Sequence, residues 1–352
     1  MRLFRAVRML ILLASSILAV ACNGATEPPT PDRPSVGVTA SPLPPSPATP
    51  LFPSRTVSPP LNTDTLTPTA TATATATAIP CDSTNGFCIE AGHFLLDRPI
   101  ALPGTITIDP TYPYGSTQNG TRQPHHGVEI YDASGTPVFA AADGVVIVAG
   151  DDKGSPPYSP WPNFYGNLIV LEHHLPGISQ PVFTLYGHLS KTEVQTGQNM
   201  RAGEKIGEIG ASGAAIGSHL HFEVRLGEND YDSARNPVLW LEPLSGEDGN
   251  PYGVIAGRFE DRKGNPLYYT GLNIQYLPEL GGPQAAAYPV ETYAPEDHPV
   301  HADDKWQENF ALGDLPAGHY RISFILASVL YQRWVEVQPG KLTIVTFLVS
   351  SQ

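Results

Sequence analysis

Basic residues are scarce in this chain. Its 352 residues include 20 lysines and arginines against 34 aspartates and glutamates, a formal net charge of −14 with histidine neutral. Three of the arginines lie within residues 1–22, so 17 basic residues remain against 34 acidic ones beyond that point. Because a surface that grips nucleic acid needs clustered positive charge, a nucleic-acid partner is disfavoured.

The chain also lacks a long apolar run. Its most apolar stretch, in residues 1–22, has arginines at its start and a short apolar core, and it ends in Ala19-Val20-Ala21-Cys22. A membrane-spanning helix needs about 20 apolar residues, so this pattern predicts an export signal instead. Its end resembles a bacterial lipobox, which predicts a lipid anchor on Cys22, although Ala19 stands where such boxes usually carry leucine. Cleavage by an ordinary signal peptidase is the alternative.

Cysteine is rare, with three in the chain. Cys81 and Cys88 lie seven residues apart, and in an exported protein they can form a disulfide that closes a small loop. Two free thiols are the alternative. Lipidation of Cys22 would account for the odd cysteine.

Residues 23–80 contain few apolar side chains but 14 prolines and 13 threonines, including a Thr-Ala repeat. This composition predicts an extended linker, which could reach roughly 180 Å at about 3.1 Å per residue. Such a tether would let a membrane-anchored module act on the cell wall. The linker separates the signal from two further segments, residues 81–246 and 250–350.

Both of these segments lack the periodicity of a long amphipathic helix. Short runs rich in β-branched and aromatic residues are separated by Gly, Pro, Asn and Asp. Residues 81–246 are therefore predicted to form antiparallel β-sheets, and residues 250–350 a small β-sandwich. The expected strands include residues 136–139, 144–148, 167–171, 182–186, 253–259, 272–276, 309–312, 318–324, 331–337 and 342–347.

Two histidines two residues apart stand in the run from Gly217 to Arg225. Leu220, Phe222 and Val224 alternate there with His219, His221 and Glu223, which predicts a strand with one apolar and one polar face. Alternate residues lie roughly 6.6 Å apart on one face, so one imidazole can hold a metal while its neighbour reaches the metal-bound water. A chance pair on a solvated face is the alternative.

Further candidate ligands precede this strand. His125 and Glu129 are four residues apart, and His188 ends another predicted strand. A straight strand would separate His125 and Glu129 by about 13 Å, too far for one ion, so the chain must bend at Pro124 and Gly127. Two imidazoles and a carboxylate with one open position are the arrangement of a hydrolytic zinc site.

These motifs occur in a recognisable order, and the stretch resembles the lysostaphin-type (LytM-type) peptidoglycan metalloendopeptidases over about 120 residues. The resemblance implies a compact antiparallel β fold with a zinc site, ligands at His125, Glu129 and His221, and His188 and His219 beside the metal-bound water. It also implies cleavage of peptidoglycan peptides. The motifs are His125xxxGlu129, Gly135-Thr136-Pro137-Val138, Asp143-Gly144-Val145-Val146, Tyr165-Gly166-Asn167, Tyr186-Gly187-His188-Leu189-Ser190, Gly197-Gln198, Gly203-Glu204-Lys205-Ile206-Gly207, Gly210-Ala211-Ser212-Gly213 and Ser218-His219-Leu220-His221-Phe222-Glu223-Val224.

One residue departs from the family pattern, because Glu129 stands where the family ordinarily has aspartate. Glutamate also binds zinc well, so we expect an intact site and a zinc-dependent endopeptidase acting on peptide cross-links of bacterial peptidoglycan at the cell envelope. A non-catalytic wall-binding module that activates other hydrolases would share the fold. A lipoyl or biotin carrier is disfavoured, because the Met-Lys hairpin of such carriers is missing.

Other polar residues near these motifs have weaker signals. Tyr186 and Asn167 can line a groove or support the strands. Glu223 and Arg225 can bond a ligand imidazole or form a solvated pair. No role is expected for His126, His173 or His174. The run from Asp314 to Tyr320 resembles a turn of carboxypeptidase-regulatory-like or transthyretin-like sandwich domains, which says little about function.

Overall fold

A computed structural model describes residues 81–154, 156–294 and 300–349. These residues belong to the compact unit Thr75–Gln352. The expected export signal, Cys22 and the Pro/Thr-rich segment lie outside the described residues. Within the described ranges, no helix is long and apolar enough to cross a membrane.

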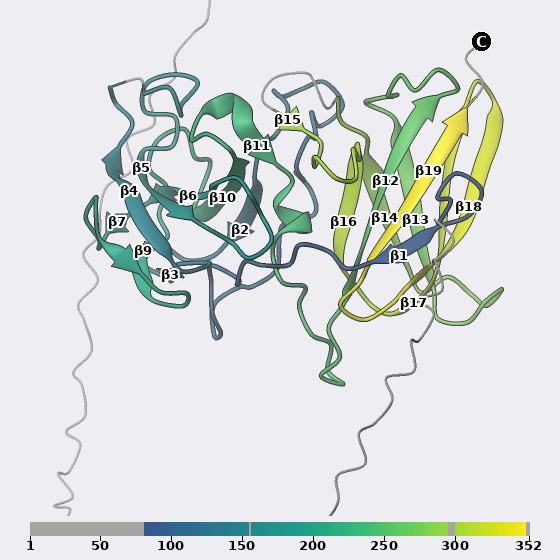
Figure 1. The fold of residues 1–352 in the computed structure, drawn as a ribbon, viewed down its shortest axis with the longest axis horizontal. Helices are drawn as coiled ribbons and strands as arrows, with labels where there is room; N and C mark the ends of the chain where they lie inside the picture. The colour runs from purple at the N-terminus through teal and green to yellow at the C-terminus, as the bar shows by residue number, and fades with distance from the viewer. Residues whose placement is uncertain (1–80, 155, 295–299, 350–352) are drawn as a thin grey trace, which may run out of the picture. The chain divides into compact units, whose positions relative to one another are not determined.

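The described residues form four β-sheets and two short 3₁₀ helices, without an α-helix (Figure 1). The first part of the chain is therefore mainly antiparallel β, as predicted. Its strands are β2 (Val128–Tyr131), β3 (Pro137–Phe139), β4 (Gly144–Asp151), β5 (Asn167–His173), β6 (Val182–Leu189), β7 (Lys191–Thr192), β8 (Asn199–Met200), β9 (Lys205–Glu208), β10 (His219–Leu226) and β11 (Ala234–Arg235), with the 3₁₀ helices η1 (Tyr231–Ser233) and η2 (Pro237–Leu239).

Most of these strands form an eight-stranded sheet of order β15-β11-β10-β6-β5-β4-β8, with β2 paired to β10. A separate three-stranded sheet has the order β3-β9-β7. Val138 and Ile206 of the small sheet share one apolar core with Leu220 and Phe222 of β10. The alternation read from the sequence therefore holds, since the apolar residues of β10 face this core.

The C-terminal part is a β-sandwich, as predicted, made of the sheets β1-β19-β12-β16 and β14-β13-β17-β18. A second apolar core lies between them, with Phe259 and Phe347 from one sheet and Ile274 and Ile322 from the other. The strands are β1 (Cys88–Glu90), β12 (Gly253–Asp261), β13 (Gly271–Leu277), β14 (Ala286–Glu291), β15 (Val300–His301), β16 (Phe310–Leu315), β17 (Gly318–Leu326), β18 (Val329–Val337) and β19 (Leu342–Val349).

The sheet β1-β19-β12-β16 is covered on both faces. Ile255 and Val345 face the sandwich core, whereas Val254, Ala256 and Ile344 join the core of the first part. Because both faces are covered over most of their length, Val254, Ile255 and Ala256 of β12 and most of β19 form apolar runs without alternation. The two strands also pair in parallel, a departure from the otherwise antiparallel sandwich.

Two strands lie outside the segments in which the sequence placed them. β1 falls in the segment 81–246 but pairs with β19 of the sandwich, and β15 follows residue 250 but pairs with β11 (Figure 1). Both are two or three residues long, too short for their pairing to be read from sequence. Just before β1, Cys81 and Cys88 form a disulfide, which resolves the alternative of free thiols.

The run from Asp314 to Tyr320 carries the chain from one sandwich sheet to the other. It contains the end of β16 and the start of β17, which belong to different sheets. Its resemblance to carboxypeptidase-regulatory-like or transthyretin-like turns stays a prediction.

Candidate metal centre

Strand β10 lies between β2 and β6, and this pairing assembles the site. His221 faces Glu129 of β2 on one side and Gly187 of β6 on the other. Glu129 is the second residue of β2, and His125 lies in the irregular segment just before it. The chain thus bends between these two residues, as their spacing requires.

Gly127, at this bend, allows the close approach of the His221 ring. A Cβ atom at Gly127 would lie 2.7 Å from His221 Cε1 and 2.7 Å from the carbonyl oxygen of Phe222. Since real Cβ atoms do not approach so closely, any larger residue would displace the imidazole or the strand.

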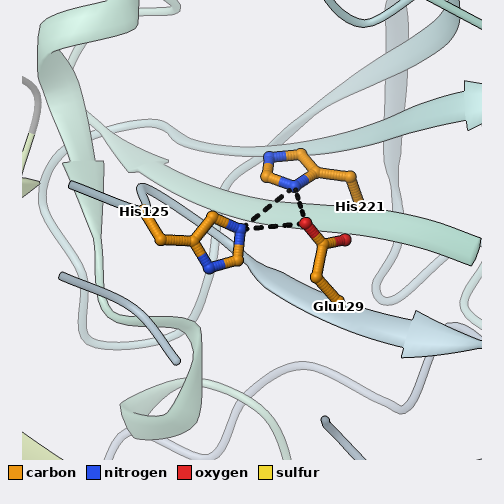
Figure 2. Close-up of side chains that lie close together, drawn as sticks. All are labelled: His125, Glu129 and His221. Atoms are coloured by element: carbon orange, nitrogen blue, oxygen red, sulfur yellow. Dashed lines mark hydrogen bonds and ion pairs between the residues drawn. The ribbon is translucent and has the colours of Figure 1, made fainter. Parts of the chain in front are cut away.

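Three side-chain atoms converge at the centre of the site (Figure 2). His125 Nε2 lies 3.0 Å from Glu129 Oε1, His221 Nδ1 lies 3.1 Å from the same oxygen, and the two nitrogens are 3.4 Å apart. Ligand atoms about 2.0 to 2.1 Å from a tetrahedral zinc ion stand roughly 3.3 Å from one another. The three separations therefore fit the edges of a zinc tetrahedron.

The hydrogen-bond partners of the two imidazoles identify the atoms free to bind a metal. The Nδ1 of His125 lies 2.7 Å from the carbonyl oxygen of Tyr112, and the Nε2 of His221 lies 2.9 Å from Oε1 of Glu223. Each of these nitrogens has an acceptor, so the other nitrogen of each ring is turned towards Glu129 Oε1. A cation between the three atoms, either a proton shared by His221 and Glu129 or a metal ion, compensates the buried carboxylate.

The second carboxylate oxygen of Glu129 is also without a donor. Glu129 Oε2 is buried and has no hydrogen-bond partner among the described residues. His219 Nε2 lies 3.2 Å away, but His219 Nδ1 donates to the Gly217 carbonyl at 3.1 Å, so Nε2 presents a lone pair and not a proton. A buried carboxylate oxygen left in this way is costly unless a cation or a proton compensates it.

The pKa values of His221 and Glu129 are shifted by the charges that surround the centre. Burial disfavours the charged form of His221, but the carboxylates of Glu129 and Glu223 raise its pKa to about 10. Burial would raise the pKa of Glu129, yet His221 and His125 hold it well below its ordinary value. The site thus attracts positive charge to the position where the three ligand atoms meet.

His188 and His219 border these three residues, with ring centroids 4.8 Å apart, and both are buried. His188, the residue before the last of β6, has a left-handed conformation with φ of +61°, and its Nδ1 lies 2.9 Å from the Ser212 carbonyl. Burial lowers the pKa of both rings, that of His188 to about 4. Both imidazoles are therefore neutral near pH 7, and each keeps an unprotonated Nε2. The left-handed backbone of His188 is strained for a residue other than glycine, and strain of this kind is often found at functional sites.

A buried polar network supports the His221 ring from behind. Glu223 Oε1 lies 2.9 Å from His126 Nε2 and accepts the Tyr165 hydroxyl at 2.6 Å, while Arg225 Nε donates to Oε2 at 2.7 Å. Glu223 and Arg225 are fully buried, so the alternative of a solvated pair is wrong. Arg225 and its neighbours hold the pKa of Glu223 well below its ordinary value although burial would raise it.

The expectation that His126 has no part in the site is wrong. Its ring is buried beside Tyr231 and Phe164, and its bond to Glu223 closes the network. Strand parity failed as a guide because His126 precedes β2 and lies in the bend. His126, His221 and Glu223 could by geometry hold a second ion. The Arg225 guanidinium already compensates Glu223 there, so a supporting role fits better.

Four further residues lie outside the group of converging ligand atoms. Tyr186 is buried, and its hydroxyl accepts the Ala141 amide at 2.9 Å, while Asn167 donates to the Leu189 carbonyl at 3.0 Å. Neither faces the ligand atoms, so support of the strands is the role that the structure gives them. His173 bonds the Asp143 carbonyl and the Thr184 hydroxyl, and His174 is exposed.

The segment that contains this centre is similar to known proteins. The model of peptidase family M23 matches residues 123–233, a range that contains His125, Glu129, His188, His219 and His221. The peptidoglycan DD-endopeptidase ShyB of Vibrio cholerae serotype O1 is 36% identical over 137 residues, which are 39% of this chain and 29% of that protein.

Two other similar proteins match over the same part. The lipoprotein YgeR of Escherichia coli K12, whose name calls it uncharacterized, is 32% identical over 131 residues, or 37% of this chain and 43% of that one. A crystal structure of a zinc containing peptidase from Vibrio cholerae is 29% identical, covers 40% of this chain and 38% of that one, and has a TM-score of 0.28, too low to support the fold. The matches span less than half of each of these proteins. The sequence match alone shows that residues 123–233 form a LytM-type peptidase M23 domain.

Proposed function

We propose that this protein is a zinc-dependent endopeptidase that hydrolyses peptide cross-links of bacterial peptidoglycan at the cell envelope. The observation that carries the proposal is the convergence of His125 Nε2, Glu129 Oε1 and His221 Nδ1, three buried ligand atoms within 4.8 Å of one another. The family match and the similarity to ShyB support peptide cleavage in the cell wall.

His125, Glu129 and His221 would hold the zinc ion. When bound, zinc polarises a peptide carbonyl and lowers the pKa of a coordinated water to about 7. The side chain of Glu129 reaches His125 and His221 from its place directly opposite His221 in the β2–β10 ladder. The glutamate thus meets both imidazoles without any change in the strand pairing.

His188 and His219 would act as the general base and the oxyanion-stabilising group. Each has its Nδ1 fixed by a backbone carbonyl and its Nε2 free, so each can accept a proton at that atom. Their lowered pKa values keep them neutral and ready to accept it. A ring that has taken the proton can then donate it to the leaving amine or stabilise negative charge on the carbonyl oxygen.

Export and tethering complete the proposal. Lipidation of Cys22 would anchor the protein to the membrane, and residues 23–80 would let residues 81–246 reach the wall. YgeR, which matches the same part, is called a lipoprotein, and this supports an extracytoplasmic location.

Zinc analysis of the purified chain and digestion of purified peptidoglycan test the function. We expect about one zinc per chain and release of soluble peptides, whose masses identify the bond that is cut. Glu129→Asp should keep both metal and activity, because it restores the carboxylate that the family ordinarily uses, whereas Glu129→Ala should lose both. Absence of zinc and of released peptides in the wild type would favour the non-catalytic activator.

A further inference from the structure

The candidate ligand His125 depends on residues 112–116 for its position. The amide of Gly115 donates to the His125 carbonyl at 2.5 Å, and the His125 amide donates to the Ser116 carbonyl at 3.1 Å. The Tyr112 carbonyl fixes the imidazole through Nδ1, and the Tyr112 ring stacks on it at 4.1 Å. Both the backbone and the ring of His125 therefore move with this short segment.

The same segment is attached to the sandwich through one carboxylate. Glu291, the last residue of β14, accepts the Ser116 hydroxyl at 3.1 Å and the Thr117 amide at 3.0 Å on Oε2, and the Thr117 hydroxyl at 3.2 Å on Oε1. Ser116 and Thr117 are each 6% exposed. Within the described residues, no lysine, arginine or histidine forms an ion pair with Glu291, whose half-buried carboxylate is compensated by these three donors and by solvent.

Close packing beside Glu291 holds the segment against the sandwich. Gly115 has φ of +76°, and a Cβ atom there would lie 2.3 Å from Cβ of Tyr293. Tyr114 meets the edge of the same Tyr293 ring at 5.3 Å, and its hydroxyl accepts the His301 amide at 2.9 Å. With contacts on both sides of Glu291, the segment has little freedom to move independently of the sandwich.

We propose that Glu291 is a positioning residue for the metal centre, through which the C-terminal sandwich sets the placement of His125 and hence the affinity for zinc. This inference rests on the proposed function in that it takes His125 as a ligand. Residues that orient a ligand from outside the coordination sphere typically change metal affinity by 10- to 100-fold. Since Glu291 acts through the backbone of residues 115–117, the lower end of that range applies.

The experiment measures the zinc dissociation constant of the full chain by competition with a chromophoric chelator. Glu291→Ala should weaken zinc binding about tenfold and alter the d–d absorption bands of the cobalt-substituted protein. Glu291→Gln should have a smaller effect, because its amide oxygen still accepts from Ser116 and Thr117. Glu336→Ala removes a carboxylate from β18 of the same sandwich and should leave affinity and spectrum unchanged.

Amide hydrogen exchange on metal-free protein provides a readout that does not need zinc. In Glu291→Ala, the amides of Gly115 and His125 should exchange faster than in the wild type and in Glu336→Ala, while the amides of β5 and β6 stay protected. Unchanged zinc affinity in folded Glu291→Ala, or unchanged exchange at these two amides, would overturn the inference. A wild type that binds zinc but cleaves no peptidoglycan would refute the proposed function alone.

Discussion

Strands β10 and β17 have the same alternating pattern but use it differently. In β17, Tyr320, Ile322 and Phe324 are buried, while Arg321 and Ser323 on the other face are only half-buried. In β10 all eight residues are buried, including the polar ones. Alternation therefore predicts a strand in both cases, but it does not show whether the polar face meets water or other side chains.

Burial of the polar face of β10 needs compensation. Polar groups taken out of water cost free energy unless they are paired, and charged groups cost more. Glu223 is bonded by His126, His221, Tyr165 and Arg225, whereas Glu129 Oε2 has no hydrogen-bond partner among the described residues. The part of the strand that remains uncompensated is the part that we propose binds zinc.

The largest expected effect separates ligand from catalyst on the polar face of β10. His221→Ala should lose most of the zinc and all measurable cleavage, because it removes one of three ligands. His219→Ala and His188→Ala should keep zinc, since neither side chain contributes one of the three converging ligand atoms. General acid and base groups contribute about 100- to 10,000-fold, so turnover on cell-wall peptide should fall by a factor in that range.

Zinc content measured beside turnover for the three variants checks this separation. Loss of zinc from His219→Ala as complete as from His221→Ala would mean that both histidines are ligands. Cleavage at the wild-type rate in both His219→Ala and His188→Ala would place the catalytic groups elsewhere.

The next largest effect is expected from removal of Arg225, which compensates the charge of Glu223 beside His221. Arg225 donates to Glu223 and also to the Tyr165 hydroxyl and the Tyr158 carbonyl, so Arg225→Ala leaves a buried carboxylate without its main cation. Removal of one partner from a buried pair typically costs about 3 to 5 kcal/mol. Denaturant unfolding should show this loss, and zinc affinity should fall as well because Glu223 orients His221. A loss below about 1 kcal/mol would show that the pair is not coupled to folding.

A third effect contrasts Glu223 with Glu308, a second buried carboxyl group. Glu308, between β15 and β16, accepts the Tyr293 hydroxyl and the Asp303 amide. The carboxylate of Asp303, itself bonded to His93, is a nearby negative charge. Among the described residues no cation pairs with Glu308, so burial raises its pKa from 4.5 to about 8.

The sign of the resulting pH dependence follows from proton binding. Between pH 4.5 and 8 the folded state keeps the Glu308 proton that the unfolded state has lost, so the free energy of unfolding falls as pH rises. The loss across this window is on the order of 5 kcal/mol. Glu308→Gln keeps a neutral side chain of the same shape and should remove this loss. Parallel stability curves for wild type and variant from pH 5 to 8 would show that Glu308 is ionised in the folded protein.

Much of the fold was predictable because short-range patterns determine it. The strands around Leu168, Leu185 and Ile322 lie where β-branched runs and turn residues placed them. The cross-pairing of β1 and β15 was not predictable, because two or three residues carry no register signal of their own. The same applies to the double burial of β12, which depends on what packs against its second face.

The five candidate site residues lie close together in the structure, and their division into ligands and catalytic groups stays a prediction. The residues that orient them have weaker sequence signals. Strand parity predicts no role for His126, but parity does not hold in a bend before a strand. Tyr112 acts on His125 through its carbonyl oxygen, an atom that every residue possesses. Glu291 lies far along the chain, so only the folded structure brings it to residues 115–117.

The smallest expected effect concerns Arg321, the counterpart of Arg225 on the polar face of β17. Arg321 donates to Gln275 at 2.7 Å and lies over the Trp334 ring at 5.8 Å, but its side chain is only half-buried and pairs with no carboxylate within the described residues. Loss of a polar contact at a half-buried side chain of this kind costs about 0.5 to 1 kcal/mol. Arg321→Ala should therefore lower the free energy of unfolding by no more than about 1 kcal/mol and leave zinc affinity unchanged. Denaturant titration beside Arg225→Ala makes the comparison direct, since the same substitution is made on equivalent faces of two strands. Equal losses in both variants would contradict the view that burial of the polar face distinguishes β10.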